Sequence, residues 1–248
     1  YVEAVVKNKY WVGSYPASSI VKEIVSLKPD LVINDILDTK IVDVAPIKKM
    51  GIKTVSFEDL GRGATYTDLT INEIYDEPRF NAKHVLWGYK YFFLRDEFDV
   101  VRPHRFVKDI QGVMLTFGGT DQHDLTRKVF HAVKYFCEEN DIKIHLVTGP
   151  GYKYRNRLMR EIENTAIATV THGSEVISGI METVQLAITS NGRTVYEFAQ
   201  MNIPAIVIAQ HEREITHSFA KCENDFVPLG VYSAGVTEKS VVEAFGKV

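Results

Sequence analysis

The residues of this sequence with the clearest capacity for chemistry are Gly118-Gly119-Thr120-Asp121, which follow the apolar run Val113–Phe117 and precede a helical pattern. A buried strand that ends in two glycines and leads into a helix brings uncovered backbone N–H groups to the helix amino terminus. Such a place favours phosphate, because these groups and the positive end of the helix dipole converge there. The same residues also suit an ordinary tight turn in which Asp121 only caps the helix. Both interpretations stay open at this point.

A second segment of the same kind is Ser190-Asn191-Gly192-Arg193-Thr194, which lies between a strand pattern and a helical pattern. It offers backbone amides, two hydroxyl groups and the guanidinium of Arg193. Glu197 lies one helical turn after Thr194 on the same helix face, where a carboxylate can accept both hydroxyls of a ribose while the turn holds a diphosphate. Thr194 and Glu197 also match a Thr-x-x-Glu capping box, which needs no ligand.

The elements around these segments decide whether they can meet. Strand-like and helix-like stretches alternate over most of the chain, which predicts parallel strands and the α/β class. In the second half we expect strands at 112–117, 143–148, 166–171, 184–189 and 204–209, and helices at 124–140, 154–165, 173–182, 194–200 and 212–221. In open sheets of this class, ligands collect beyond the carboxyl ends of the strands. Three such ends carry the polar residues, the third being Gln210-His211-Glu212, although a histidine there is more often an ordinary helix-start residue.

The first half alternates in the same way but opens with YVEAVVKNKYWVG, which has no Gly-rich loop of the nucleotide-binding type. Helices are expected at 20–27 and 40–50, and strands at 31–35, 53–57 and 67–72. A charged stretch from residue 98 to 109, which contains Pro103, breaks the pattern and predicts a linker. We therefore expect an incomplete Rossmann-like domain at 1–108 and a complete one at 109–248.

The composition excludes several classes of protein. A formal net charge of −3 gives no support to nucleic acid as the main partner. The longest apolar runs, such as Ile203–Ala209, are too short to cross a bilayer. The two cysteines, Cys137 and Cys222, lack metal-ligand spacing and favour a reducing compartment. We expect a soluble, cytoplasmic protein that uses neither a metal nor another cofactor.

Taken together, the segments resemble nucleotide-sugar enzymes of the GT-B fold, and most closely the UDP-sugar hydrolases of pseudaminic acid biosynthesis and their spore-coat-polysaccharide relatives. The nucleotide-binding half of that family is similar to Phe117–Asp121 and Thr189–Glu197, which read FGGTD and TSNGRTVYE. Its interdomain signature is similar to GYKYFFLRDEF at Gly88–Phe98. Its first domain is similar to Leu31–Asp35, Val55–Asp59 with Arg62, and Asp68–Asn72.

The resemblance implies a UDP-sugar as the ligand and hydrolysis as the reaction. Glu197 would hold the ribose, Asn191–Thr194 with Gly118 and Gly119 would hold the diphosphate, and main-chain groups near Val170 and Thr171 would bind the uracil. Water would attack the anomeric carbon without a metal. The first domain would supply the sugar pocket and a titratable group within reach of that water.

Two features depart from the family. The first is that no Gly-rich loop with a catalytic histidine is found, since His84, the first histidine of the sequence, does not match the histidine of that loop. The second is that Gln210-His211-Glu212 replaces the Asn-Gln pair that follows the last strand in the family. We therefore assign no catalytic residue and expect the chain to be part of a longer enzyme, fused to or associated with another sugar-nucleotide enzyme. The alternatives are a GT-B glycosyltransferase and a non-catalytic nucleotide-sugar-binding domain.

Overall fold

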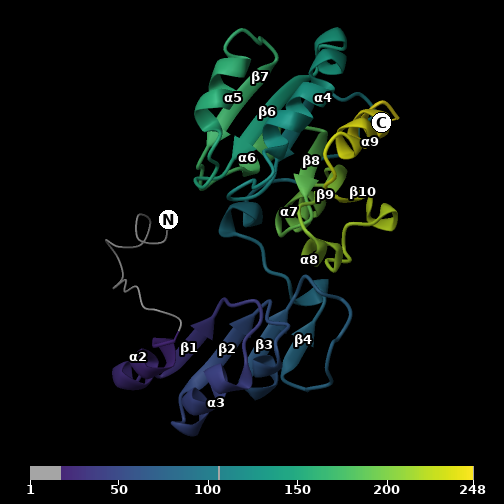
Figure 1. Cartoon of the computed structure of the whole chain (residues 1–248). Coiled ribbons are helices and arrows are strands. Elements are labelled where there is room, and N and C mark those ends of the chain that lie inside the picture. The colour runs from purple at the N-terminus through teal and green to yellow at the C-terminus, as the bar shows by residue number, and fades with distance from the viewer. Residues whose placement is uncertain (1–17, 106, 248) are drawn as a thin grey trace. The chain divides into compact units, whose positions relative to one another are not determined.

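The structure is a computed structural model that describes residues 18–105 and 107–247. The chain divides into two compact units, Tyr1–Phe93 and Leu94–Val248, and each contains one parallel sheet with its own helices (Figure 1). The α/β class and the two Rossmann-like sheets predicted from the sequence are confirmed. The opening segment, in which no Gly-rich loop was found, lies outside the described residues.

The first unit contains a four-stranded sheet in the order β1-β2-β3-β4, and every neighbouring pair is parallel. Its strands are β1 (Leu31–Asn34), β2 (Lys53–Phe57), β3 (Leu69–Asn72) and β4 (Val85–Trp87). Its helices are α2 (Ile20–Leu27) and α3 (Ile41–Lys49), with 3₁₀ turns η1 (Arg62–Tyr66) and η2 (Tyr89–Tyr91). The sequence did not predict β4, because three residues are too few to show a period.

The second unit contains a six-stranded parallel sheet in the order β10-β9-β8-β5-β6-β7. Its strands are β5 (Gly112–Thr116), β6 (Lys143–Thr148), β7 (Ala168–His172), β8 (Leu186–Ser190), β9 (Ala205–Ala209) and β10 (Phe226–Val231). The chain first runs outward from β5 through β6 to β7 and then returns to build β8, β9 and β10 on the other side of β5. The strand order therefore reverses between β5 and β8, and ligands of open α/β sheets bind at such a reversal.

Helices and apolar side chains form the core around this sheet. The helices are α4 (Leu125–Glu139), α5 (Arg155–Ile162), α6 (Ser178–Met181), α7 (Thr194–Gln200), α8 (Glu212–Ile215) and α9 (Val236–Phe245), with 3₁₀ turns η3 (Asp96–Asp99) and η4 (Cys222–Asn224). Strands β5, β8 and β9 are buried along their whole length. Val113, Leu115 and Phe117 pack with residues of α4 in one buried cluster. These central strands are long apolar runs in the sequence because both faces of the sheet are covered.

The second unit differs from the sequence prediction in its helices and at its end. The helices expected at 173–182 and 212–221 shorten to the four residues of α6 and of α8, and β10 and α9 were not predicted. Strand β10 was missed because its Pro228 and Gly230 are typical of a turn. A proline is nevertheless tolerated in an edge strand such as β10. The register of its pairing with β9 shifts between Pro228 and Val231.

The boundary between the two units also differs from the prediction at residue 108. The division by contacts falls between Phe93 and Leu94. The segment expected as a linker, 98–109, is bonded to the second unit, because the His104 N–H donates to the Met201 carbonyl at 2.9 Å and Asn202 Nδ2 donates to the His104 carbonyl at 3.0 Å. These bonds are between residues far apart in the chain, and no local pattern could have indicated them.

Candidate functional site

The Gly118–Asp121 segment has the shape of a tight turn at the end of β5. Gly118 has a φ of +74°, which only glycine adopts without strain. The Asp121 carboxylate accepts the backbone N–H groups of Leu125 and Thr126 at 2.7 and 2.8 Å. The amino end of α4 is therefore already covered by a carboxylate, as the capping interpretation predicted. A phosphate in this region has to be held by the Gly118–Gly119 backbone and not by the dipole of α4.

A neighbouring turn, Gly149–Gly151 after β6, supports the Gly118–Gly119 turn from behind. The N–H of Gly151 donates to the Gly119 carbonyl at 3.0 Å. A Cβ atom on Gly149 would lie 2.4 Å from the Cα of Gly119, so the backbones touch directly. This support was missed in the sequence, although the strand-end rule applied to β6 as well.

The second segment connects β8 to α7. Helix α7 begins at Thr194 with Arg193 at the N-cap position, and no side chain caps it. The Thr194–Glu197 capping box considered from the sequence is therefore not formed. Thr189 and Ser190 are buried at the end of β8, and the Thr189 hydroxyl has no partner among the described residues. The role of Glu197 thus has to be sought elsewhere than in capping.

The third segment, Gln210-His211-Glu212, lies after β9 and is tied to the other two. Gln210 donates through Nε2 to the Phe117 carbonyl at 3.0 Å, and its N–H donates to the Glu214 carboxylate at 2.8 Å. The Asn191 side chain donates to the carbonyls of Glu214 and His217 at 2.7 and 3.0 Å. Asn191 therefore organises the loop after β9, and its amide nitrogen is occupied by the protein.

The three segments line one cavity of about 340 Å³. Most of the residues predicted from the sequence lie on its wall: Gly118, Gly119, Thr120, Ser190, Gly192, Arg193, Thr194, Gln210 and His211. Phe117, Gln122 and Glu214 complete the lining and were not predicted. The cavity lies at the carboxyl ends of β5, β8 and β9, which is the place where the strand order reverses.

The remaining predicted residues do not line this cavity. Asp121 and Asn191 are buried and hold the loops by the bonds described above. Val170 and Thr171 lie on β7, an edge strand of the sheet, and are half-buried. The structure thus leaves the uracil contacts expected at β7 as a prediction. Glu197 is also buried outside the lining.

The Glu197 side chain is 10% exposed and forms an ion pair with Arg95, whose Nε lies 2.9 Å from Glu197 Oε1. Burial raises the pKa of the Glu197 carboxyl above its ordinary value, and the bond and charge of Arg95 oppose that rise. Arg193 also favours the charged carboxylate, whereas Glu97 disfavours it. Arg95 was quoted in the sequence only as part of the Gly88–Phe98 signature, so its partner was not predicted.

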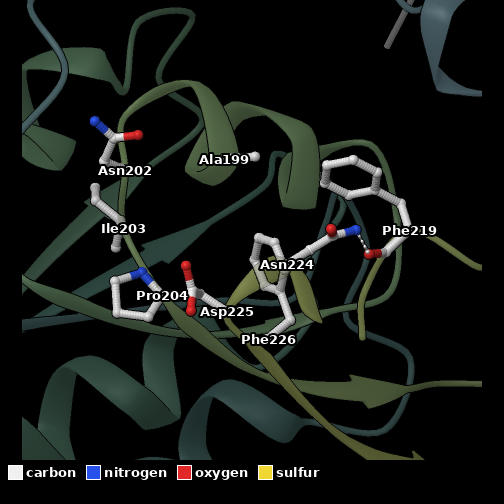
Figure 2. Close-up of a pocket in the computed structure, with 8 residues that line it drawn as sticks. All are labelled: Ala199, Asn202, Ile203, Pro204, Phe219, Asn224, Asp225 and Phe226. Atoms are coloured by element: carbon white, nitrogen blue, oxygen red, sulfur yellow. Dashed lines mark hydrogen bonds between the residues drawn. The ribbon is translucent and has the colours of Figure 1, made fainter. Parts of the chain in front are cut away.

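A larger cavity, of about 620 Å³, lies at the opposite end of the second sheet. Ile203 and Pro204 directly precede β9, and Asp225 and Phe226 stand at the start of β10, so this cavity is at the amino ends of the strands (Figure 2). Its polar side chains are engaged in part, since Asn224 donates through Nδ2 to the Phe219 carbonyl at 2.8 Å (Figure 2). Size alone therefore does not identify the site, and the strand-end rule favours the smaller cavity.

The first unit contains the acidic residues that resembled the family's first domain. Asp59 is fully buried, and its carboxylate accepts the N–H groups of Thr39 and Gly61, both at 2.9 Å. Asp68 pairs with Lys53 at 3.0 Å at the amino end of β2. Hydrogen bonds to Thr54 and Lys53 lower the pKa of the Asp68 carboxyl. Both carboxylates are engaged by the protein, and neither is assigned a chemical role.

Within 18–105 and 107–247, no three or more histidine, cysteine, aspartate or glutamate side chains gather in an arrangement that holds a metal ion. Over the same residues, no helix has the length and apolar character needed to cross a membrane.

The two parallel sheets and the cavity at the strand reversal define an α/β protein of the GT-B fold. No family model matches the chain. It is 27% identical over 203 residues to the spore coat polysaccharide biosynthesis protein SpsG of Bacillus subtilis, covering 79% of this chain and 60% of SpsG. It is 26% identical over 226 residues to an uncharacterized protein of Methanocaldococcus jannaschii, covering 85% of this chain and 45% of that protein. The chain thus spans about half the length of the curated relatives it matches.

Among solved structures, the chain is similar to MnaA of Staphylococcus aureus in complex with UDP. The TM-score is 0.65 at 13% identity, and the match covers 99% of this chain and 76% of MnaA. At this identity the likeness shows the fold alone.

Proposed function

We propose that the second unit binds the UDP group of a UDP-sugar in the cavity at the ends of β5, β8 and β9. The observation that carries this proposal is the convergence of the Gly118–Gly119 turn with the Ser190–Thr194 segment in that cavity. The backbone amides of these glycine-containing turns and the Arg193 guanidinium suit a diphosphate, because they donate hydrogen bonds and positive charge without filling the space. The UDP bound in MnaA, a protein of the same fold, supports the choice of nucleotide.

In this proposal Glu197 accepts the ribose hydroxyls. Glu197 is the acidic side chain in the first turn of α7, directly after the diphosphate segment. The absence of a capping box leaves its carboxylate without a helix-terminal role. Its ion pair with Arg95 favours the charged form, which accepts hydroxyl hydrogen bonds.

The proposed reaction is hydrolysis of the UDP-sugar in the biosynthesis of a surface glycan. Water attacks the anomeric carbon, the glycosidic C–O bond breaks, and UDP leaves with the bonding electron pair. The likeness to SpsG supports a role in polysaccharide biosynthesis. The group that activates water is expected in the first unit, together with the sugar pocket. The alternative with the same site is transfer of the sugar to an acceptor.

Nucleotide binding is tested by calorimetry with UDP on the wild-type chain and on Glu197→Ala. The variant is expected to bind UDP more weakly by about 1–3 kcal/mol, because ribose hydroxyls are then left without an acceptor. Glu161→Ala is the matched control, since Glu161 is also ion-paired but lies on α5. Equal UDP affinity in the wild-type chain and Glu197→Ala rules out the ribose assignment.

The reaction is tested by following free UDP released from UDP-sugars with and without candidate acceptors. A hydrolase releases UDP in the absence of an acceptor, whereas a transferase requires one. Tight UDP-sugar binding without release under either condition, measured on the full-length protein, identifies a binding domain instead.

A further inference from the structure

Arg95 is bonded to three separate parts of the second unit. Its Nε donates to Glu197 Oε1 on α7 at 2.9 Å, and its Nη1 donates to the Glu175 carbonyl in the loop after β7 at 2.9 Å. The same Nη1 lies 2.7 Å from the Glu97 carboxylate. The guanidinium therefore has its orientation determined from several sides.

Glu97 is itself held in place. Its other carboxylate oxygen accepts the backbone N–H groups of Ile177 and Ser178 at the start of α6. The Glu97 side chain is 10% exposed, as is that of Glu197. Arg95 thus bridges two buried carboxylates, of which only Glu97 has backbone partners in the structure as described. The second carboxylate, on Glu197, depends on Arg95 for its position.

We propose that Arg95 is a positioning residue that orients the Glu197 carboxylate to accept the ribose hydroxyls. This inference rests on the proposed function, because it assigns a role to a residue that supports the UDP site. A carboxylate offers about four acceptor positions, and the Arg95 Nε uses one of them on Oε1. The bond therefore holds the carboxylate at Oε1 and leaves acceptor positions for two hydroxyls.

Arg95 also favours the charged form of this carboxylate. The charged groups that face Glu197 are Arg95 and Glu97 from the segment before β5 and Arg193 at the N-cap position of α7. Burial raises the pKa of Glu197, and Arg95 opposes this more strongly than Arg193 does. Removal of the Arg95 charge therefore raises this pKa further. A protonated Glu197 has fewer acceptor positions, so the preference for ribose hydroxyls is lost as the pH falls through this pKa.

The experiment compares UDP with 2′,3′-dideoxy-UDP in calorimetric titrations from pH 5 to pH 8. Both nucleotides carry the same diphosphate, so the ratio of their dissociation constants isolates the contribution of the ribose hydroxyls. The variants are Arg95→Gln, which removes the charge, and Arg95→Lys, which keeps it without the planar fork. The control is Arg157→Gln, because Arg157 also pairs with a glutamate through Nε at 3.0 Å but lies on α5. Thermal unfolding of each variant verifies that it is folded.

The wild-type chain and Arg157→Gln are expected to prefer UDP by about 10- to 100-fold. Arg95→Gln is expected to reduce that preference to below about threefold. As the pH is lowered, the variant is expected to lose its remaining preference for UDP at a higher pH than the wild-type chain does. Arg95→Lys is expected to restore part of the preference. A folded Arg95→Gln that keeps the wild-type preference and pH profile overturns the role of Arg95. A wild-type chain that fails to bind UDP, or binds both nucleotides equally, instead overturns the proposed function.

Discussion

The direct contact between the Gly149 and Gly119 backbones predicts that Gly149→Ala damages the nucleotide site from behind. A Cβ atom at position 149 would lie 2.4 Å from the Gly119 Cα, 2.5 Å from its carbonyl oxygen and 2.7 Å from its carbonyl carbon. All three neighbours are backbone atoms, so no side chain can rotate away. The Gly118–Gly119 turn itself has to move.

The magnitude follows from these distances. Ordinary van der Waals contact with a Cβ begins at 3.4 Å, so the two turns must separate by about 1 Å. Overpacking of this kind costs about 1–3 kcal/mol of stability, and for a chain of this length that lowers the melting temperature by several degrees. The same displacement lengthens the hydrogen bonds from the turn to a diphosphate, which weakens UDP binding by about 10- to 100-fold.

The measurements are thermal unfolding and UDP calorimetry on Gly149→Ala, with Gly179→Ala as the matched control. A Cβ on Gly179 meets no heavy atom within 4 Å, and Gly179 lies in α6. Gly179→Ala is therefore expected to keep its UDP affinity and to be at least as stable as the wild-type chain. Wild-type UDP affinity in Gly149→Ala would refute the claim that the Gly149 turn positions the site.

Two further predictions concern the loops around the cavity. Asp121→Ala leaves the N–H groups of Leu125 and Thr126 without their carboxylate, so urea unfolding is expected to show a loss of about 1–3 kcal/mol, and an unchanged unfolding midpoint would contradict the capping role. Burial lowers the pKa of His217 in the folded chain, so this histidine binds a proton more readily in the unfolded chain. The free energy of unfolding therefore falls as the pH decreases below about 6.5. His217→Gln is expected to show a shallower loss of stability between pH 7 and pH 5, and an equal pH slope in the two chains would disprove this origin.

The sequence predicted the central elements of the second unit well because their signals are local. The segments Lys143–Thr148 and Thr194–Gln200 agree with the predicted bounds, and β5, β8 and β9 are within two residues of them. Strands buried on both faces are continuous apolar runs, which can be recognised without knowledge of their neighbours. The short helices α6 and α8 were overestimated for the opposite reason, since helix ends depend on contacts from outside the segment.

Local sequence also favoured interpretations that the structure rejects. Thr194 and Glu197 have the spacing of a capping box, yet the N-cap position of α7 is Arg193, no side chain caps the helix, and the Glu197 carboxylate pairs with Arg95. Arg95 and Glu197 are separated by 102 positions in the sequence, and no periodicity links them. The contact between Gly119 and Gly149 is likewise invisible in sequence, because a glycine required for close packing reads like a glycine in any turn.

The sequence by itself determined the α/β class, the buried strands and the three polar segments that follow them, because each depends on residues adjacent in the chain. Only the tertiary structure decided which of those residues share a cavity, that Asp121 covers the start of α4, and that Arg95 holds Glu197. The physical reason is that a parallel sheet joins segments through crossover connections. Side chains at its carboxyl edge therefore meet in space without any regular spacing in sequence.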